Sequence, residues 1–166
     1  MTQLTEQHAR QIFADVNTRN VDKIVEHYAD NATFQVPNLD APLVGKEAIR
    51  TYVSSALAAF PDWTMDVKEI LVSGQEAVVV NSVHGTHTGP YTTKDGKSVQ
   101  PTNKKLNQEQ LTRVVVNEDG KVSLFRAYGN PSSINRMLRP PQPVVTTHTE
   151  TTSSTHTRGA TPATQA

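Results

Sequence analysis

Apolar residues in the first sixty positions recur at the spacing of amphipathic helices. The first predicted helix has the i, i+3, i+4, i+7 order of one face in Ala9, Ile12, Phe13 and Val16. The second, shorter helix has the stripe Val21, Ile24, Val25 and Tyr28. The third, over about 46–59, carries on one side Ile49, Tyr52, Val53, Ala56 and Phe60. The pattern therefore predicts three helices with one face each toward a core.

Single residues mark where these helices begin and end. Asn20 is the expected N-cap of the second helix, because its side chain can accept a hydrogen bond from a free backbone N–H. The pair Asp30-Asn31 is expected to end that helix and to precede a short strand over 32–36. Pro61 ends the third helix, since proline cannot donate a backbone hydrogen bond.

From Trp63 onward the hydrophobic pattern changes to period 2, which indicates strands. Four long strands are predicted, over 63–72, 77–88, 106–116 and 121–128. Segments 73–76 and 117–120 have the composition of hairpin turns, and segment 89–105 that of a loop or small hairpin. Helices followed by hairpin-linked strands predict an α+β fold with a mainly antiparallel sheet.

The C-terminal part of the chain differs in composition. Segment 131–138 can form a last short helix, but segment 140–166 contains no Leu, Ile, Met or aromatic residue. Such a Thr/Pro-rich segment cannot bury enough apolar area to offset the entropy lost on ordering. We therefore expect one folded domain over 1–138 and a disordered tail over 139–166.

Composition narrows the classes of function. Lys and Arg total 16, as do Asp and Glu, so no basic excess holds a phosphate backbone and no nucleic-acid partner is expected. The absence of cysteine excludes disulfides, thiolate metal sites and cysteine nucleophiles. No apolar run has the length of a membrane span, and the polar N-terminus lacks a secretory segment. We expect a cytoplasmic protein with no membrane partner.

Four segments in a fixed order carry a resemblance to a known family. They are YADNATFQVP with GKEAIRTYV, FPDWTMDVKEILVSGQEAVV, GTHTGPY with PTNKK, and NEDGKVSLFRAYGNPSSINRML. Together these segments, which cover roughly residues 5–138, resemble the SnoaL-like polyketide cyclase family of the nuclear transport factor two-like superfamily. The resemblance implies a cone-shaped α+β barrel, in which a curved sheet packs on the helices and encloses an apolar pocket. It also implies a homodimer packed through the sheet.

Members of this family include polyketide cyclases, ketosteroid isomerase-like enzymes, epoxide hydrolases and proteins with no assigned reaction. The resemblance implies an enzyme without cofactor or metal, which applies acid–base chemistry to a small apolar carbonyl or polyketide-like substrate. A cyclase, an isomerase or a hydratase would fit. The alternative is a non-catalytic protein that binds a hydrophobic metabolite in the pocket, or a protein partner through the sheet. Fold alone does not decide between them.

Strand alternation places His87 on one face of segment 77–88 with Asn81, and the family pattern turns this face toward the pocket. His87 is therefore a candidate catalytic base or hydrogen-bond donor near neutral pH, and Asn81 a candidate substrate-binding residue. The alternative for His87 is a partly buried histidine satisfied by a backbone group. The opposite, half-apolar face is expected to pack in the dimer and carries Val78, Val80, Ser82, His84 and Thr86.

Asn130 resembles the position at which the cyclases of the family carry their general acid/base aspartate. An amide cannot exchange a proton as a carboxylate does, so this departure puts an intramolecular aldol cyclisation in doubt. Asn130 also precedes Pro131, and this pair has the composition of an N-cap and first helical residue. It is kept as a catalytic candidate beside this structural alternative.

Arg126 and Tyr128 share a face of segment 121–128 with Asn130 and are candidate substrate-binding residues. Arg126 can bind a carboxylate or enolate oxygen, or can pair with Glu109 on the neighbouring strand. The inward set of segment 106–116 stays open, because both sets are mixed. One set contains Glu109 and the other Gln108 and Gln110. If Glu109 faces inward, it is the best remaining proton acceptor, with a pKa raised by burial.

Three further residues are candidate substrate-binding groups. Trp63 and Met65 share a face of their strand, and Phe34 lies on a face of the first strand. Such a lining suits a planar apolar ligand, and it is also what a hydrophobic core looks like.

Overall fold

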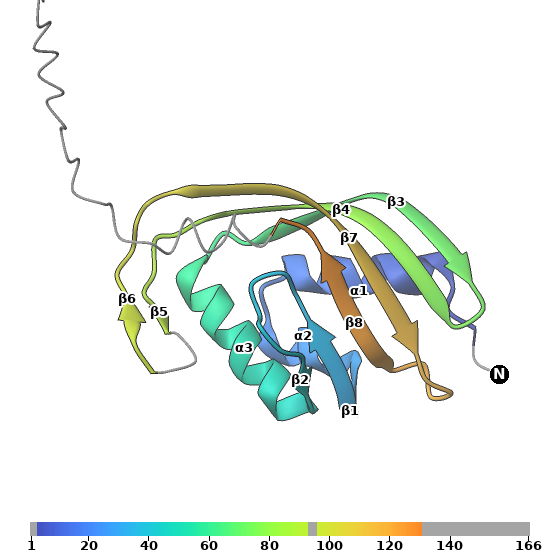
Figure 1. Ribbon diagram of the computed structural model, residues 1–166. Coiled ribbons are helices and arrows are strands. Elements are labelled where there is room, and N and C mark those ends of the chain that lie inside the picture. The colour runs from blue at the N-terminus through green and yellow to red at the C-terminus, as the bar shows by residue number, and fades with distance from the viewer. Residues whose placement is uncertain (1–2, 93–95, 131–166) are drawn as a thin grey trace, which may run out of the picture.

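Three helices lie under a curved sheet in the computed structural model, which describes residues 3–92 and 96–130 (Figure 1). The helices are α1 (Glu6–Asn17), α2 (Val21–Glu26) and α3 (Lys46–Ala59). The strands are β1 (Tyr28–Gln35), β2 (Leu43–Val44), β3 (Thr64–Ser73), β4 (Glu76–Thr86), β5 (Tyr91–Thr92), β6 (Ser98–Val99), β7 (Lys105–Val116) and β8 (Val122–Tyr128). The last helix and the tail predicted for 131–166 lie outside the described residues.

The large sheet has the strand order β2-β1-β8-β7-β4-β3. Every pair of neighbours is antiparallel except β1 and β8, which run parallel. The sheet is therefore mixed rather than purely antiparallel, and the predicted α+β class is confirmed. Strands β5 and β6 form the expected small hairpin, which packs beside α3 (Figure 1). No helix in the described ranges is long and apolar enough to cross a membrane.

The helix ends follow local capping chemistry. Thr5 caps α1 by accepting from the His8 backbone N–H, and Asn20 caps α2 by accepting from the Lys23 backbone N–H. The predicted end of the second helix was wrong. Strand β1 begins at Tyr28, so Asp30-Asn31 lie inside it, both exposed, at an irregularity in its pairing with β8. The irregularity lets this polar pair face solvent without ending the strand.

The core is an aromatic cluster between the helices and the sheet. The rings of Phe34 and Phe125 stack at 5.2 Å between centroids and 9° between planes. Tyr28, Tyr52 and Phe13 pack around this pair, with ring centroids between 5.3 and 6.1 Å from one of the two rings. Rings stacked in this way contribute roughly 0.5–1.5 kcal/mol beyond the area they bury. They hold β1, β8, α1 and α3 together.

The GTHTGPY segment packs the end of β4 closely against the end of α3. Gly89 donates its backbone N–H to the Ala59 carbonyl at 3.1 Å, and a Cβ added to Gly89 would lie 1.8 Å from the Ala58 carbonyl oxygen. Asp62 accepts from the backbone N–H of Thr86 at 2.7 Å and from its hydroxyl at 2.9 Å. Because glycine has no Cβ, this segment lets the sheet approach the end of α3 at a distance that no other residue would allow.

Candidate functional site

An apolar pocket opens between the helices and the inner face of the sheet. Its cavity volume is about 70 Å³, and it is lined by Val16, Ile24, Tyr28, Phe34, Val36, Pro37, Asn38, Tyr52, Val53, Ala56, Leu57, Trp63, Met65, Gln110 and Phe125. This cavity is smaller than the roughly 300–1,000 Å³ of typical small-molecule sites. Three sequence candidates, Phe34, Trp63 and Met65, thus come together in the lining, and their role in substrate binding stays a prediction.

The pocket lining also contains the hydroxyl groups of Tyr28 and Tyr52. The Tyr52 hydroxyl donates to Asn38 Oδ1 at 3.1 Å. Burial raises the pKa of Tyr28 and of Tyr52 well above the usual tyrosine value, and for Tyr52 the hydrogen bond to Asn38 opposes this effect. Both tyrosines therefore keep their protons at neutral pH and serve as hydrogen-bonding groups rather than as bases.

The inner face of the sheet carries side-chain amides next to the pocket. In β7 the inward set is Leu106, Gln108, Gln110 and Thr112, all buried. In β4 the buried Asn81 lies opposite Gln110, and the Thr112 hydroxyl donates to Asn81 Oδ1 at 2.9 Å. The sequence left open which set of this strand faces inward, because amides on the inner face are as polar as the residues on the outer face.

Glu109 faces outward, contrary to the expectation that made it a proton acceptor. It is exposed and accepts a hydrogen bond from Lys68 Nζ at 2.8 Å. The reason is strand alternation: because Gln108 and Gln110 face the interior, the residue between them must face solvent. Glu109 therefore has no place in the pocket and does not pair with Arg126.

Arg126 and Tyr128 also lie on the outer face, so the expectation that they line the pocket was wrong. The stacking of Phe125 on Phe34 turns Phe125 and Ala127 inward and Arg126 and Tyr128 outward. The Arg126 guanidinium lies 4.9 Å over the Tyr128 ring, and Tyr128 is 45% exposed. This contact occupies an outer surface of the sheet.

Asn130 is exposed just after the end of β8 and is not among the pocket-lining residues. The helix that it was expected to cap lies outside the described residues. The resemblance of Asn130 to the aspartate of the cyclases therefore finds no counterpart in the geometry of the described pocket.

His87 faces inward and is fully buried, but it does not line the pocket. Its Nδ1 accepts from the Thr102 backbone N–H at 3.2 Å, so the proton of the neutral ring is on Nε2. Burial lowers the pKa of His87, against a smaller rise caused by the Gly89 backbone, and His87 is neutral at pH 7. The ring packs against Phe60 at 5.4 Å, and Phe60 packs in turn against Trp63 at 5.6 Å. Two aromatic rings thus link His87 to the pocket.

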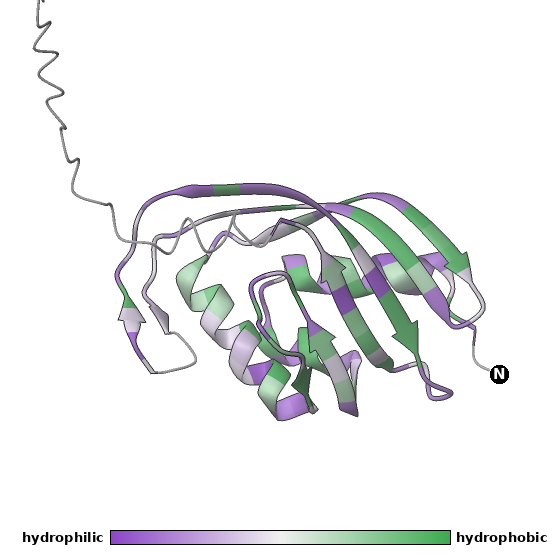
Figure 2. Cartoon of the chain, in the orientation of Figure 1, coloured by the Kyte–Doolittle hydropathy of each residue, from purple (hydrophilic) through white to green (hydrophobic). Residues whose placement is uncertain are grey.

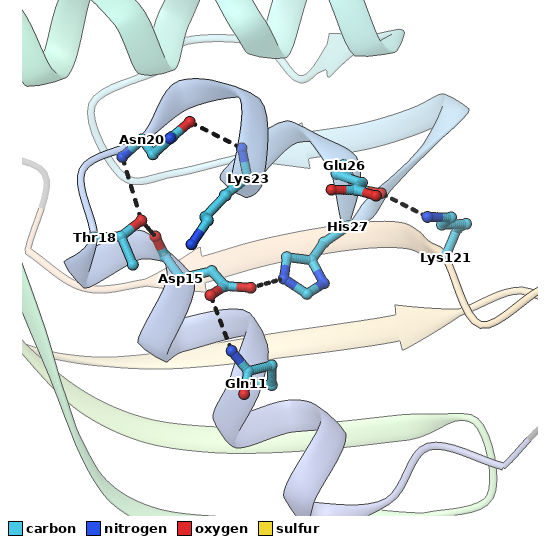
Figure 3. Close-up of polar contacts among 8 residues, drawn as sticks. All are labelled: Gln11, Asp15, Thr18, Asn20, Lys23, Glu26, His27 and Lys121. Carbon is cyan, nitrogen blue, oxygen red and sulfur yellow. Dashed lines mark hydrogen bonds and ion pairs between the residues drawn. The ribbon is translucent and has the colours of Figure 1, made fainter.

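A polar cluster on the helical side was missed by the sequence reasoning (Figure 3). His27 Nε2 lies 2.6 Å from Asp15 Oδ2, and Gln11 donates to the other oxygen of this carboxylate at 2.9 Å. Lys121 Nζ donates to the Glu26 carbonyl at 2.8 Å. No periodic signal joins residues of two helices and a distant turn, so only the folded chain brings them together.

The Asp15–His27 pair connects two segments that each carry a pocket-lining residue. Asp15 precedes Val16 and His27 precedes Tyr28, and both of these neighbours line the pocket. The hydrogen bond from His27 holds the pKa of Asp15 below its usual value. Among residues 3–92 and 96–130, no group of three or more His, Cys, Asp or Glu side chains could hold a metal ion.

This geometry defines the class of protein, which is a cone-shaped α+β domain with an inner apolar pocket. The chain matches the SnoaL-like domain over residues 9–125 and belongs to that family. No curated protein matches it.

Three solved structures illustrate the shared fold. A candidate SnoaL-like polyketide cyclase from Jannaschia sp. CCS1 has a TM-score of 0.68 at 15% identity, over 86% of this chain and 100% of that one. A protein with a ketosteroid isomerase-like fold from Catenulispora acidiphila DSM 44928 has a TM-score of 0.65 at 13% identity, over 81% and 93%. The epoxide hydrolase/cyclase-like enzyme SalBIII has a TM-score of 0.63 at 19% identity, over 77% and 92%. At these identities the likeness shows the fold.

Asp15→Asn is expected to lower stability in a pH-dependent way. The pKa of Asp15 is lower in the folded than in the unfolded chain, so its contribution is present above about pH 4 and is lost as the pH falls through the folded-state value. Thermal unfolding should show a Tm lower by about 2–5 °C at pH 7, on the order of 1 kcal/mol for one charge-assisted hydrogen bond. The difference from wild type should shrink between about pH 5 and pH 3.

The control is Asp40→Asn, which removes the same charge from an exposed loop position. It should leave the Tm within about 1 °C of wild type, as surface substitutions usually do. A Tm difference for Asp15→Asn that stayed constant across this pH range would contradict the role given to the carboxylate.

Proposed function

We propose that this protein binds a small, planar, largely apolar carbonyl compound in the inner pocket. The observation that carries the proposal is the lining, in which aromatic and aliphatic side chains surround the amide of Gln110 and the hydroxyls of Tyr28 and Tyr52. Apolar walls with a few convergent polar groups are the usual composition of a small-molecule site.

The walls favour a flat ligand. Phe34 and Phe125 present stacked rings, and Trp63 and Met65 lie in the same lining. A ring system placed against them buries apolar surface at about 25 cal/mol per Å². A thioether beside an aromatic ring adds a further weak attraction.

The polar groups favour an oxygen acceptor on that ligand. The Gln110 amide can donate a hydrogen bond, and so can the Tyr28 hydroxyl, which remains protonated because burial raises its pKa. These groups hold and polarise a carbonyl oxygen. They do not remove a proton, so the geometry favours binding, with recognition by hydrogen bonds, over proton transfer within the lining.

Acid–base catalysis by His87 is the second candidate, of the isomerase or cyclase type that the family name suggests. The observation that favours it is the Nε2 atom of His87, which is buried and without a partner among the described residues. Because the proton of the neutral ring is on Nε2, this atom can donate a hydrogen bond to a carbonyl oxygen and stabilise the enolate that forms there. For this role the ligand must reach past Phe60, whose ring contacts His87.

A second copy of the chain is the partner that we propose for the outer sheet face. Leu111 and Tyr128 lie side by side there and are 41% and 45% exposed, with Val80 on the other side of Leu111. Two nearby ion pairs lie within the chain, Lys68 with Glu109 and Arg113 with Glu76, and the Arg126 guanidinium lies over the Tyr128 ring. An apolar centre with a rim of satisfied charges suits a twofold, self-complementary interface.

Ala56→Phe should block the pocket, because Ala56 lines it from α3. Titration with 1-acetonaphthone, followed by calorimetry, should give an affinity at least about tenfold weaker than wild type, a change of about 1.4 kcal/mol. The matched control is Ala58→Phe, an exposed position on the same helix, which should bind as wild type does. Equal binding by all three proteins would place the ligand site outside this pocket.

Catalysis by His87 predicts exchange of the methyl hydrogens of 1-acetonaphthone in D2O. Wild type should accelerate this enolisation at least about tenfold over buffer, within the contribution of a single hydrogen-bond donor to the developing enolate oxygen. His87→Gln should return the rate to that of buffer, with affinity within about twofold of wild type. If the methyl hydrogens exchange at the buffer rate with wild-type protein, catalysis by His87 is excluded and ligand binding remains the proposed function.

Leu111→Glu should break the proposed dimer, because it buries an unpaired charge at the centre of the interface. Light scattering at micromolar concentration should give twice the chain mass for wild type and the single chain mass for the variant. Val44→Glu adds the same charge at an exposed position of the short edge strand β2 and should stay dimeric. A wild-type mass of one chain would refute the interface.

A further inference from the structure

The segment between β1 and β2 separates two hollows of the molecule. Val36 and Pro37 line the inner pocket, and both also line an open hollow of about 220 Å³ on the outer side, next to Arg126 and Tyr128 of β8. The inner cavity, at about 70 Å³, is below the size of typical small-molecule sites. A ligand of the proposed kind therefore requires part of the wall to move, and this segment has free space on both of its sides.

Few hydrogen bonds hold this segment in place. Inside it, the Leu39 backbone N–H donates to the Val36 carbonyl at 3.0 Å. Pro37 and Pro42, near its two ends, have no backbone N–H to donate. Among the described residues, the hydrogen bonds that tie residues 37–42 to other elements run through one side chain, that of Asn38. A segment with so few bonds opens at a lower free energy than the strands beside it.

The Asn38 side chain joins the segment to two other elements. The Tyr52 hydroxyl on α3 donates to Asn38 Oδ1 at 3.1 Å. Burial raises the pKa of Tyr91 on β5, and a hydrogen bond to the Asn38 side chain opposes that rise. Strand β5 belongs to the small hairpin that packs beside α3 (Figure 1). One amide thus connects the segment, the helix and the hairpin.

The segment also contacts the wall of the pocket through apolar side chains. Figure 2 shows that α3 is hydrophilic at its N-terminal end and hydrophobic toward its C-terminal end. The pocket-lining residues Val53, Ala56 and Leu57 belong to this hydrophobic half, and the partly buried Leu39 packs against the core. Apolar contacts are not directional, so they allow the segment to shift. The hydrogen bonds of Asn38 are therefore what fixes its closed position.

We propose that residues 36–42 form a lid over the inner pocket, and that Asn38 is the latch that holds this lid closed on Tyr52 and Tyr91. When the latch opens, the lid moves toward the outer hollow and the two spaces join, which gives a ligand its way in. When the latch closes again, the lid shields the bound ligand from water, as loops do in other sites. This inference rests on the proposed function, because it names the route by which a ligand reaches the same pocket.

Backbone hydrogen exchange of the unliganded protein tests the lid without any ligand. Asn38→Leu and Tyr91→Phe each remove part of the latch. In both variants exchange over residues 36–44 should become about two- to tenfold faster, the effect of losing a neutral hydrogen bond. Exchange over β7 should stay within about twofold of wild type, which shows that the fold as a whole is intact.

The matched control is Thr51→Val, which removes from α3 a hydroxyl that donates to the Glu47 carbonyl at 3.1 Å. It should exchange at the wild-type rate over residues 36–44. Unchanged exchange of this segment in both latch variants overturns the lid.

The rates of binding give a second readout, which a residue that only contacts the ligand would not produce. Trp63 is the one tryptophan of the chain and lines the pocket, so its fluorescence reports the binding of 1-acetonaphthone in a stopped-flow experiment. Tyr91 does not line the pocket. Because the latch is closed in the free and in the bound protein and broken only between them, Tyr91→Phe should raise the association and dissociation rates together, about two- to tenfold. The Kd should stay within about twofold of wild type.

The outcomes separate the lid from the proposed function. Faster dissociation with an unchanged association rate means that the latch contacts the bound ligand instead, and overturns the lid. If 1-acetonaphthone binds to wild type but neither exchange nor the rates respond to the latch variants, the lid is overturned and the pocket keeps its proposed function. If wild type does not bind the probe although exchange responds as described, the proposed function is wrong and the lid is supported.

Discussion

The stack of Phe34 on Phe125 decides which face of the sheet is the inside. These two residues are direct partners in the parallel pairing of β1 with β8. From Phe125 the same buried row continues through Val114 on β7 to Ala77 on β4. Since side chains alternate along the regular stretches of these strands, burial of this row fixes which side chains point inward next to it on β1, β8, β7 and β4.

The chemistry of the pocket follows from that alternation. Gln108 and Gln110 face the interior because they share the parity of Val114, and Glu109 and Arg113 face solvent because they do not. A register shift of one residue would exchange the two sets and place a carboxylate and a guanidinium under the helices. The pocket thus receives groups that hydrogen-bond without titrating near neutral pH. The titratable groups pair with one another on the outer surface instead.

The sequence predicts where the helices and strands lie better than it predicts which face of each strand points inward. The three helices, the Asn20 cap and the four long strands follow from periodicity and turn chemistry, which are local. The start of β1 was missed because Asp30-Asn31 is accommodated by irregular pairing with β8, a partner nearly a hundred residues away in the chain. The inward directions of β7 and β8 were undecided or wrong because both faces mix polar and apolar residues. The Asp15–His27 pair was missed because it joins two helices.

The most recognisable segment of the sequence and the pocket have different physical roles. In GTHTGPY, Gly85 and Gly89 allow the end of β4 to lie against Phe60 and the end of α3, and Asp62 ties Thr86 to the same corner. This close approach places the Phe60 ring against His87 and so keeps the imidazole out of the pocket lining. The segment therefore has a structural role, since it joins the end of β4 to the end of α3. The polar group that β7 contributes to the pocket lining is Gln110, in a strand where no motif is visible.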